Sequence, residues 1–139
     1  MEVLEHINEA IYPRSSIEDI ASFKCSGVLN AIKGMYDACK PGGTLFMTTP
    51  NGASAECMRL GFFGYTPIAW HLHVREYGWQ NILTMLKEAG WIIQRFETIA
   101  CYMKFKSQAE IDQIIRIKQI MGPTNPHTNS TTFVIAQKP

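Results

Sequence analysis

The stretch Lys40–Asn51, KPGGTLFMTTPN, decides the fold of this chain. Pro41 cannot continue a helix, and the two glycines after it suit a helix C-cap and a turn. Residues 44–49 form a short apolar and β-branched run, which is typical of a strand buried on both faces of a parallel sheet. Pro50 and Asn51 then end the strand at its carboxyl edge, where open α/β sheets bind ligands. We therefore expect any chemistry to gather around Asn51.

The composition predicts one globular domain spanning residues 1–139, because 46% of the residues are hydrophobic and 18% are charged. A net charge of +1 gives no support to nucleic acid as a partner. No apolar run approaches the length of a membrane span, and the N-terminus lacks the pattern of a signal peptide. The four cysteines are far apart in the sequence, which favours free thiols in a reducing cytoplasm.

Other elements can be placed on either side of residues 40–51. A helical pattern runs from Ser15–Ser16 to Cys39, and another follows Glu76 and ends at Gly90. Residues 53–60 suit one short helix, and a capping box at 107–110 begins a helix that Gly122 ends. Residues 91–99 and 131–136 read as strands. The short link before the last strand indicates that it runs antiparallel, and its apolar run suits a central position.

The segment between the short helix and the Glu76 helix is rich in aromatic residues and glycines. One interpretation is a mobile lid over a small-molecule site, with an acceptor pocket shaped by Phe62, Phe63, Tyr65 and Trp70. The other is a plain surface crossover whose aromatic side chains pack beneath it. The sequence favours neither.

Two polar clusters could carry chemistry. If residues 1–7 are helical, Glu2, Glu5 and His6 share one face and could bind a divalent cation or present a base. The alternative is a solvated polar face at the terminus. His71 and His73 lie on one side of an extended segment and could bind a metal, although a structural or exposed role explains them as well.

Taken together, these segments resemble the C-terminal half of a class I S-adenosylmethionine-dependent methyltransferase. Residues 1–7 (MEVLEHI) resemble the E-V-L-E-H-V segment after the family's fourth strand. Residues 40–43 with 49–51 resemble its L-K-P-G-G…T-P-N lead-in and fifth strand. Residues 76–91 resemble its Y-T…L-L-E-A-G-F helix and sixth strand. The resemblance implies a partial Rossmann-like α/β sheet with strands equivalent to 5, 7 and 6, a remnant of strand 4, flanking helices and an antiparallel last strand.

The resemblance also implies roles for particular residues. The segment after the fourth strand borders the cofactor S-adenosylmethionine, which assigns cofactor contacts to Met1, Glu2, Val3 and Leu4. Relatives in ubiquinone synthesis and in small-RNA 2′-O-methylation use an E-x-x-E-H cluster as a metal site. Here that site maps onto Glu2, Glu5, His6 and His73, with His71 in reserve, and would hold Mg²⁺ or another divalent cation.

The expected activity is methyl transfer to a small molecule at oxygen. His6 or His73 would act as the base, or a bound metal would lower the pKa of the acceptor hydroxyl. Asn51 and the aromatic residues of the loop would contact the acceptor.

One feature of the family is missing. The glycine-rich loop after the first strand is absent, and the glycines at 42–43 precede a strand, so they cannot replace it. The sequence therefore predicts a truncated domain, inactive by itself. The alternative is a non-catalytic remnant or a module that needs a partner chain. The missing half would expose a sheet edge, which favours a dimer or a partner chain there.

Overall fold

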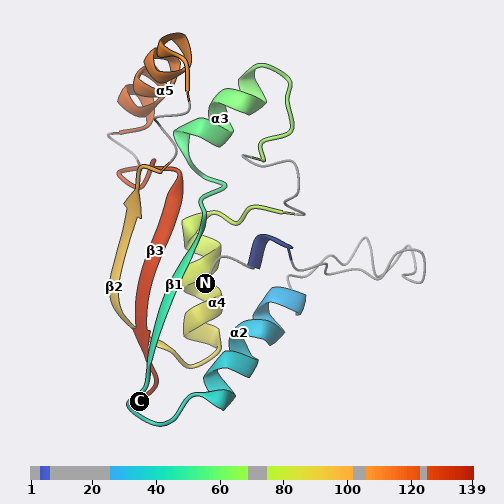
Figure 1. The fold of residues 1–139 in the computed structure, drawn as a ribbon, viewed down its shortest axis with the longest axis vertical. Helices are drawn as coiled ribbons and strands as arrows, with labels where there is room; N and C mark the ends of the chain where they lie inside the picture. The colour runs from blue at the N-terminus through green and yellow to red at the C-terminus, as the bar shows by residue number, and fades with distance from the viewer. Residues whose placement is uncertain (1–3, 7–25, 69–74, 102–105, 123–124) are drawn as a thin grey trace, which may run out of the picture.

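The sheet has three strands, and the last strand of the chain lies in its middle (Figure 1). The computed structural model describes residues 4–6, 26–68, 75–101, 106–122 and 125–139. In chain order the elements are η1 (Leu4–His6), α2 (Ser26–Ala38), β1 (Thr44–Pro50), α3 (Ala55–Phe62), α4 (Trp79–Glu88), β2 (Ile92–Ile99), α5 (Gln108–Met121) and β3 (Thr131–Gln137).

The strand order is β1-β3-β2, and β3 is antiparallel to both neighbours. β1 and β2 therefore run parallel to each other on either side of β3. The prediction of a central, antiparallel last strand is confirmed. The α/β class is confirmed as well, in the form of a small antiparallel sheet with flanking helices. The expected remnant of a fourth strand is not among the described residues, because residues 4–6 form a 3-10 helix and residues 1–3 lie outside them.

The helices in the described part of the chain cover one face of the sheet. Along β1, Met47 and Thr49 are buried, while Phe46, just before Met47, is 60% exposed. β3 alternates in the same way, with Thr132, Val134 and Ala136 buried. The prediction that residues 44–49 are buried on both faces of a parallel sheet is therefore wrong. The apolar side chain of Phe46 on the open face interrupts the apolar/polar alternation that marks a half-buried strand, so the run has the pattern of a two-sided one.

Helices α2 and α4 pack against the covered face and form the core with it (Figure 1). Val28 and Ile32 of α2 and Ile82 and Leu86 of α4 have no exposed surface. These spacings of four residues place each pair on one side of its helix, as the periodicity of the sequence predicts. Just after α4, Trp91 packs edge-on against Tyr36, with 5.4 Å between the ring centroids.

Helices α3 and α5 lie beyond the end of the sheet where β1 and β2 finish (Figure 1). Both begin at serine caps. The Ser54 hydroxyl accepts a hydrogen bond from the Cys57 amide, and Ser107 forms the expected capping box with Glu110. Among the residues that the structure describes, no helix is long and apolar enough to cross a membrane.

Candidate functional site

Asn51 holds together the segments that meet at the carboxyl end of β1. Its side-chain amide donates hydrogen bonds to the carbonyls of His127, at 3.0 Å, and Asn129, at 2.9 Å. Its side-chain oxygen accepts from the amides of Ala53, at 3.1 Å, and Trp79, at 3.3 Å. One side chain thus links β1 to the start of α4 and to the loop before β3.

These four hydrogen bonds use the full capacity of the Asn51 side chain, which has no exposed surface. In this conformation no atom of the side chain is left to bind a substrate. The predicted substrate contact therefore finds no support in the geometry. Asn51 instead positions the backbone around the site.

Aromatic side chains pack beside this hub. Trp79 stacks on Phe96 with 5.4 Å between ring centroids, and the ring of His127 lies edge-on to both at 4.6 Å. Asn51 binds the backbone of both Trp79 and His127, so the polar hub and the aromatic cluster support each other.

Glu5 is buried near the same end of β1. The Thr49 hydroxyl donates a hydrogen bond to Glu5 Oε2 at 3.3 Å, and the Glu5 side chain is 2% exposed. The Arg75 amide also donates to the Glu5 carbonyl, at 3.3 Å. Glu5 therefore brings the E-x-x-E-H segment next to the carboxyl end of β1, although Glu5 and Thr49 are 44 positions apart in the sequence.

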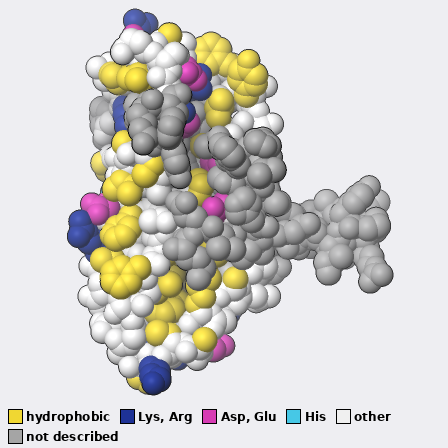
Figure 2. All heavy atoms as spheres, in the orientation of Figure 1, with side chains coloured by type: hydrophobic (Ala, Val, Ile, Leu, Met, Phe, Trp, Pro, Cys, Tyr) yellow, Lys and Arg dark blue, Asp and Glu magenta, His cyan; other side chains and the backbone are white. Residues whose placement is uncertain are grey.

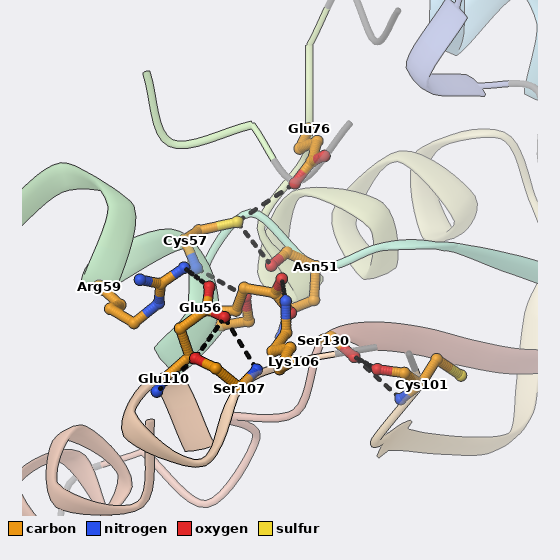
Figure 3. Close-up of polar contacts among 11 residues, drawn as sticks. Asn51, Glu56, Cys57, Arg59, Glu76, Cys101, Lys106, Ser107, Glu110 and Ser130 are labelled. Atoms are coloured by element: carbon orange, nitrogen blue, oxygen red, sulfur yellow. Dashed lines mark hydrogen bonds and ion pairs between the residues drawn. The ribbon is translucent and has the colours of Figure 1, made fainter. Parts of the chain in front are cut away.

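Cys57, in the first turn of α3, lies between two oxygen acceptors (Figure 3). Its thiol donates to Glu76 Oε2 at 3.2 Å and lies 3.7 Å from the carbonyl oxygen of Asn51. Burial, reinforced by the negative charge of Glu76, raises the pKa of this thiol from 9.0 to about 12. A thiol that stays protonated at neutral pH is a poor nucleophile. Through its hydrogen bond to Glu76, Cys57 connects α3 to the Glu76 segment.

Two ion pairs join α3 to α5 and to Lys106, two residues before α5 (Figure 3). Glu56, buried in α3, pairs with Lys106, and Arg59 pairs with Glu110 at 3.1 Å. Hydrogen bonds from the backbone and side chain of Ser107 lower the pKa of Glu110, which keeps this carboxylate ionised. The pairs fix α3 and α5 as one unit above the sheet end.

A shallow groove of about 480 Å³ lies where α3 meets the end of β1. It is lined by Gly52, Cys57, Met58, Gly61, Phe62 and Pro67. A second depression, of about 440 Å³, is lined by Leu60, Tyr65, Thr66 and Ile68. Their apolar linings suit a hydrophobic small molecule better than a charged one.

Three aromatic side chains at the end of α3 and just after it are exposed. Phe62 is 80% exposed, Phe63 57% and Tyr65 66%, so the interpretation that they pack beneath a crossover is wrong for these three. Figure 2 shows hydrophobic side chains gathered at this end of the molecule. Phe62 and Tyr65 each line one of the two depressions, which keeps the prediction of an acceptor pocket open.

Several predicted site residues lie outside the described part of the chain: Met1, Glu2, Val3, Trp70, His71 and His73. The backbone of His6 is described, but its side chain is not. Leu4 is in the hydrophobic core with no exposed surface. Within the described ranges no three His, Cys, Asp or Glu side chains gather as metal ligands. The proposed metal site therefore stays a prediction, with Glu5 as its one described member.

The sequence analysis missed three residues of this region, namely Cys57, Glu76 and His127. Cys57 and Glu76 are 19 positions apart; Cys57 belongs to no motif, and the motif that begins at Glu76 predicts no contact with a thiol. His127 stands in a polar loop, where an aromatic cluster is not expected. A buried position for Cys57 could have been inferred from the helical pattern of residues 53–60, but its acceptor could not.

No protein-family model and no curated protein matches this chain.

Proposed function

We propose that this chain is a class I S-adenosylmethionine-dependent methyltransferase fold, represented by the part that carries its last three strands. The observation that carries this proposal is the order β1-β3-β2, with an antiparallel strand between two mutually parallel ones. The resemblance implies this order for strands 5, 7 and 6. This order is less common than a sequential one, because consecutive strands are neighbours in most sheets.

The position of Glu5 gives independent support. The resemblance implies that the E-x-x-E-H segment lies beside the end of the fifth strand, at the ligand-binding edge of the sheet. The Glu5 carboxylate accepts a hydrogen bond from Thr49, the next-to-last residue of β1, which is 44 positions away in the sequence. A buried carboxylate is costly unless it is hydrogen-bonded, so this contact ties the segment to the end of β1.

Within this class we propose a methyltransferase that acts on a hydroxyl of a small molecule. The support is the apolar groove at the end of β1, with the aromatic side chain of Phe62 in its wall. The acceptor would lie against α3, and His6 or His73 would take its proton. The proposal also includes a divalent cation, held by Glu2, Glu5, His6 and His73.

The described residues do not by themselves fit the cofactor. Leu4, one of its predicted contacts, is wholly buried in the core. Two connections lead from a strand to a helix, at residues 51–54 and 100–107, and Gly52 is the one glycine in their sequences. A Cβ at Gly52 would meet the Glu76 carbonyl oxygen at 2.6 Å. Gly52 thus serves a close backbone contact and not a phosphate-type cradle.

This misfit favours the second candidate, a non-catalytic module that works with a partner chain. Calorimetric titration of S-adenosylmethionine into the 139-residue chain separates the two candidates. Binding at about micromolar Kd would require a cradle and would exclude the module. We expect no binding, or binding too weak to measure.

The oxygen assignment needs a separate test on the full-length protein. Transfer of labelled methyl groups to a panel of phenols, catechols and alcohols should be measured after dialysis, with and without Mg²⁺. Inactivity on every hydroxyl acceptor, with activity on amines or thiols, would overturn the oxygen assignment. The coding sequence upstream of Met1 provides a further check, because a G-x-G strand–loop–helix there would support the methyltransferase proposal.

A further inference from the structure

The hydrogen-bond pattern of β1 shows which of its backbone groups face outward. Asn51 donates to the Ser130 carbonyl at 2.8 Å, and Lys138 donates to the Gly43 carbonyl at 3.0 Å. Backbone groups of alternate residues in an antiparallel strand face opposite edges, so the odd-numbered residues of β1 bond to β3. The even-numbered residues Thr44, Phe46 and Thr48 direct their N–H and C=O groups away from the sheet.

The outer edge of β1 is occupied only at its end. The Gly52 amide donates to the Tyr77 carbonyl at 3.0 Å, and Pro50 has no N–H to leave unpaired. Within the described part of the chain, no backbone hydrogen bond occupies the outward groups of Thr44, Phe46 and Thr48. These three residues of β1 can therefore hydrogen-bond to another strand through their outward N–H and C=O groups.

The two edges of the sheet differ in their protection against pairing. β2 carries a register shift between Ile93 and Arg95 and an ion pair from Arg95 to Glu97 at 2.8 Å. A bulge and charges are the usual devices that prevent a sheet edge from pairing with another chain. β1 has no charged residue, no bulge and no proline before Pro50. The β1 edge therefore lacks the devices that protect β2.

The face beside this edge is also apolar. Phe46 is 60% exposed and stands opposite Ile135 of β3, and Figure 2 shows hydrophobic side chains over the sheet. The net charge of the whole chain is +1, so two copies would repel each other only weakly. These observations favour a second copy as the occupant of the edge.

We propose that β1 pairs antiparallel with β1 of a second copy about a two-fold axis at Phe46. In this register Phe46 faces its own copy, and Thr44 faces Thr48 in both directions. Every outward N–H and C=O of the three residues then has a partner. The two rings meet on the open face, where aromatic cross-strand pairs are favourable. Pro50 falls opposite Gly42, which has no side chain to obstruct it. The proposal does not depend on the proposed methyl transfer.

The first test is the molar mass of the chain by analytical ultracentrifugation from about 1 to about 200 μM. We expect a monomer–dimer equilibrium. A chain that stays monomeric throughout would leave the edge for a strand of another polypeptide and would overturn self-pairing.

Two double variants test the register. In T44K/T48K each lysine faces a lysine of the partner, and we expect the dissociation constant to rise about tenfold or more. In T44K/T48E each lysine faces a glutamate, so dimerisation should persist and should weaken with added salt. Both variants add two charges per chain at exposed or half-buried positions. Equal weakening of both would contradict the antiparallel register.

A pair of single variants tests the edge itself. Phe46→Lys places two ammonium groups at the two-fold axis and should abolish dimerisation. Ile92→Lys makes the same change at a 51% exposed position on the opposite edge strand and should leave dimerisation unchanged. Loss of the dimer in the β2 variant alone would assign the interface to β2 and overturn the proposal. Far-UV circular dichroism confirms that each variant is folded.

Discussion

At the scale of single residues, the region at the end of β1 is held by buried polar groups whose partners lie far apart in sequence. Asn51 and Glu5 are each at most 2% exposed, and both act on backbone or hydroxyl groups of other segments. Such groups stabilise the fold only while their hydrogen bonds are made, because an unsatisfied buried polar atom is costly. Substituting them should therefore cost more than burial of apolar area alone would indicate.

Replacing Asn51 with alanine should lower the free energy of unfolding by about 2 to 4 kcal/mol. The substitution leaves two carbonyls and two amides without their side-chain partner. Urea unfolding followed by circular dichroism measures the change. Asn30→Ala, at an exposed position in α2, is the matched control and should stay within about 0.5 kcal/mol of the parent. Equal effects of both substitutions would contradict the hub role of Asn51.

The Cys57 thiol should make stability fall at alkaline pH. Burial raises its pKa from 9.0 to about 12 in the folded chain, so between these values the unfolded chain ionises and the folded chain does not. The stability of the folded chain relative to the unfolded one is unaffected by ionisation of this thiol below the pKa of the thiol in the unfolded chain. It falls as the pH rises from there toward the pKa of the folded chain. Relative to Cys57→Ala, the loss should be about 1.4 kcal/mol per pH unit above about pH 9.

Urea titrations of both proteins at several alkaline pH values measure this difference. The comparison cancels the lysines and tyrosines that titrate in the same range. Parallel pH profiles for the two proteins would show that the thiol is not protected by burial.

At the scale of elements, the turn between β1 and α3 depends on a close approach of two backbones. Gly52 bonds to the Tyr77 carbonyl, and a Cβ at Gly52 would meet the Glu76 carbonyl oxygen at 2.6 Å. This contact sets the position of the Glu76 segment relative to the groove. It is a steric constraint on an irregular turn, which neither helical nor strand periodicity describes.

Gly52→Ala should therefore destabilise the protein by about 1 to 3 kcal/mol, since rigid backbone must move to make room. Gly34→Ala provides the matched control, because a Cβ at Gly34, inside α2, has nothing within 4 Å. That control should raise stability by up to about 1 kcal/mol through better helix propensity. Thermal and urea unfolding measure both. Destabilisation in the control alone would contradict this account.

At the scale of the whole molecule, the sheet is asymmetric in two ways. One face is packed against α2 and α4 while the other carries exposed Phe46, and one edge is protected while the other is not. β3 is paired on both sides, so its amides should be the slowest to exchange. β1 is paired on one side only, which makes its amides differ from one residue to the next.

Amide hydrogen exchange by NMR should show this alternation along β1. In dilute solution the amides of Leu45, Met47 and Thr49 should exchange at least about tenfold more slowly than those of Phe46 and Thr48. At high concentration Phe46 and Thr48 should become protected as β1 pairs with its copy. Uniform protection of β1 in dilute solution would contradict a free edge.

Local pattern predicted much of this fold because its signals are short-range. The turn at residues 41–43, the capping box at Ser107 and the apolar spacing in α4 each depend on residues a few positions apart. The short link before β3 even indicated its antiparallel direction. The sequence by itself therefore determined where most elements begin and end, and the α/β class they form.

Only the tertiary structure decided which distant segments of the chain lie beside one another. The four bonds of Asn51, the thiol of Cys57 beside Glu76 and the open face at Phe46 all follow from packing across long sequence separations. Because Phe46 is apolar although it lies on the open face, the pattern of residues 44–49 predicts burial on two faces where the structure buries one. Burial and hydrogen-bond satisfaction belong to the assembled chain, and these decide which residues are buried supports and which edge is open to a partner.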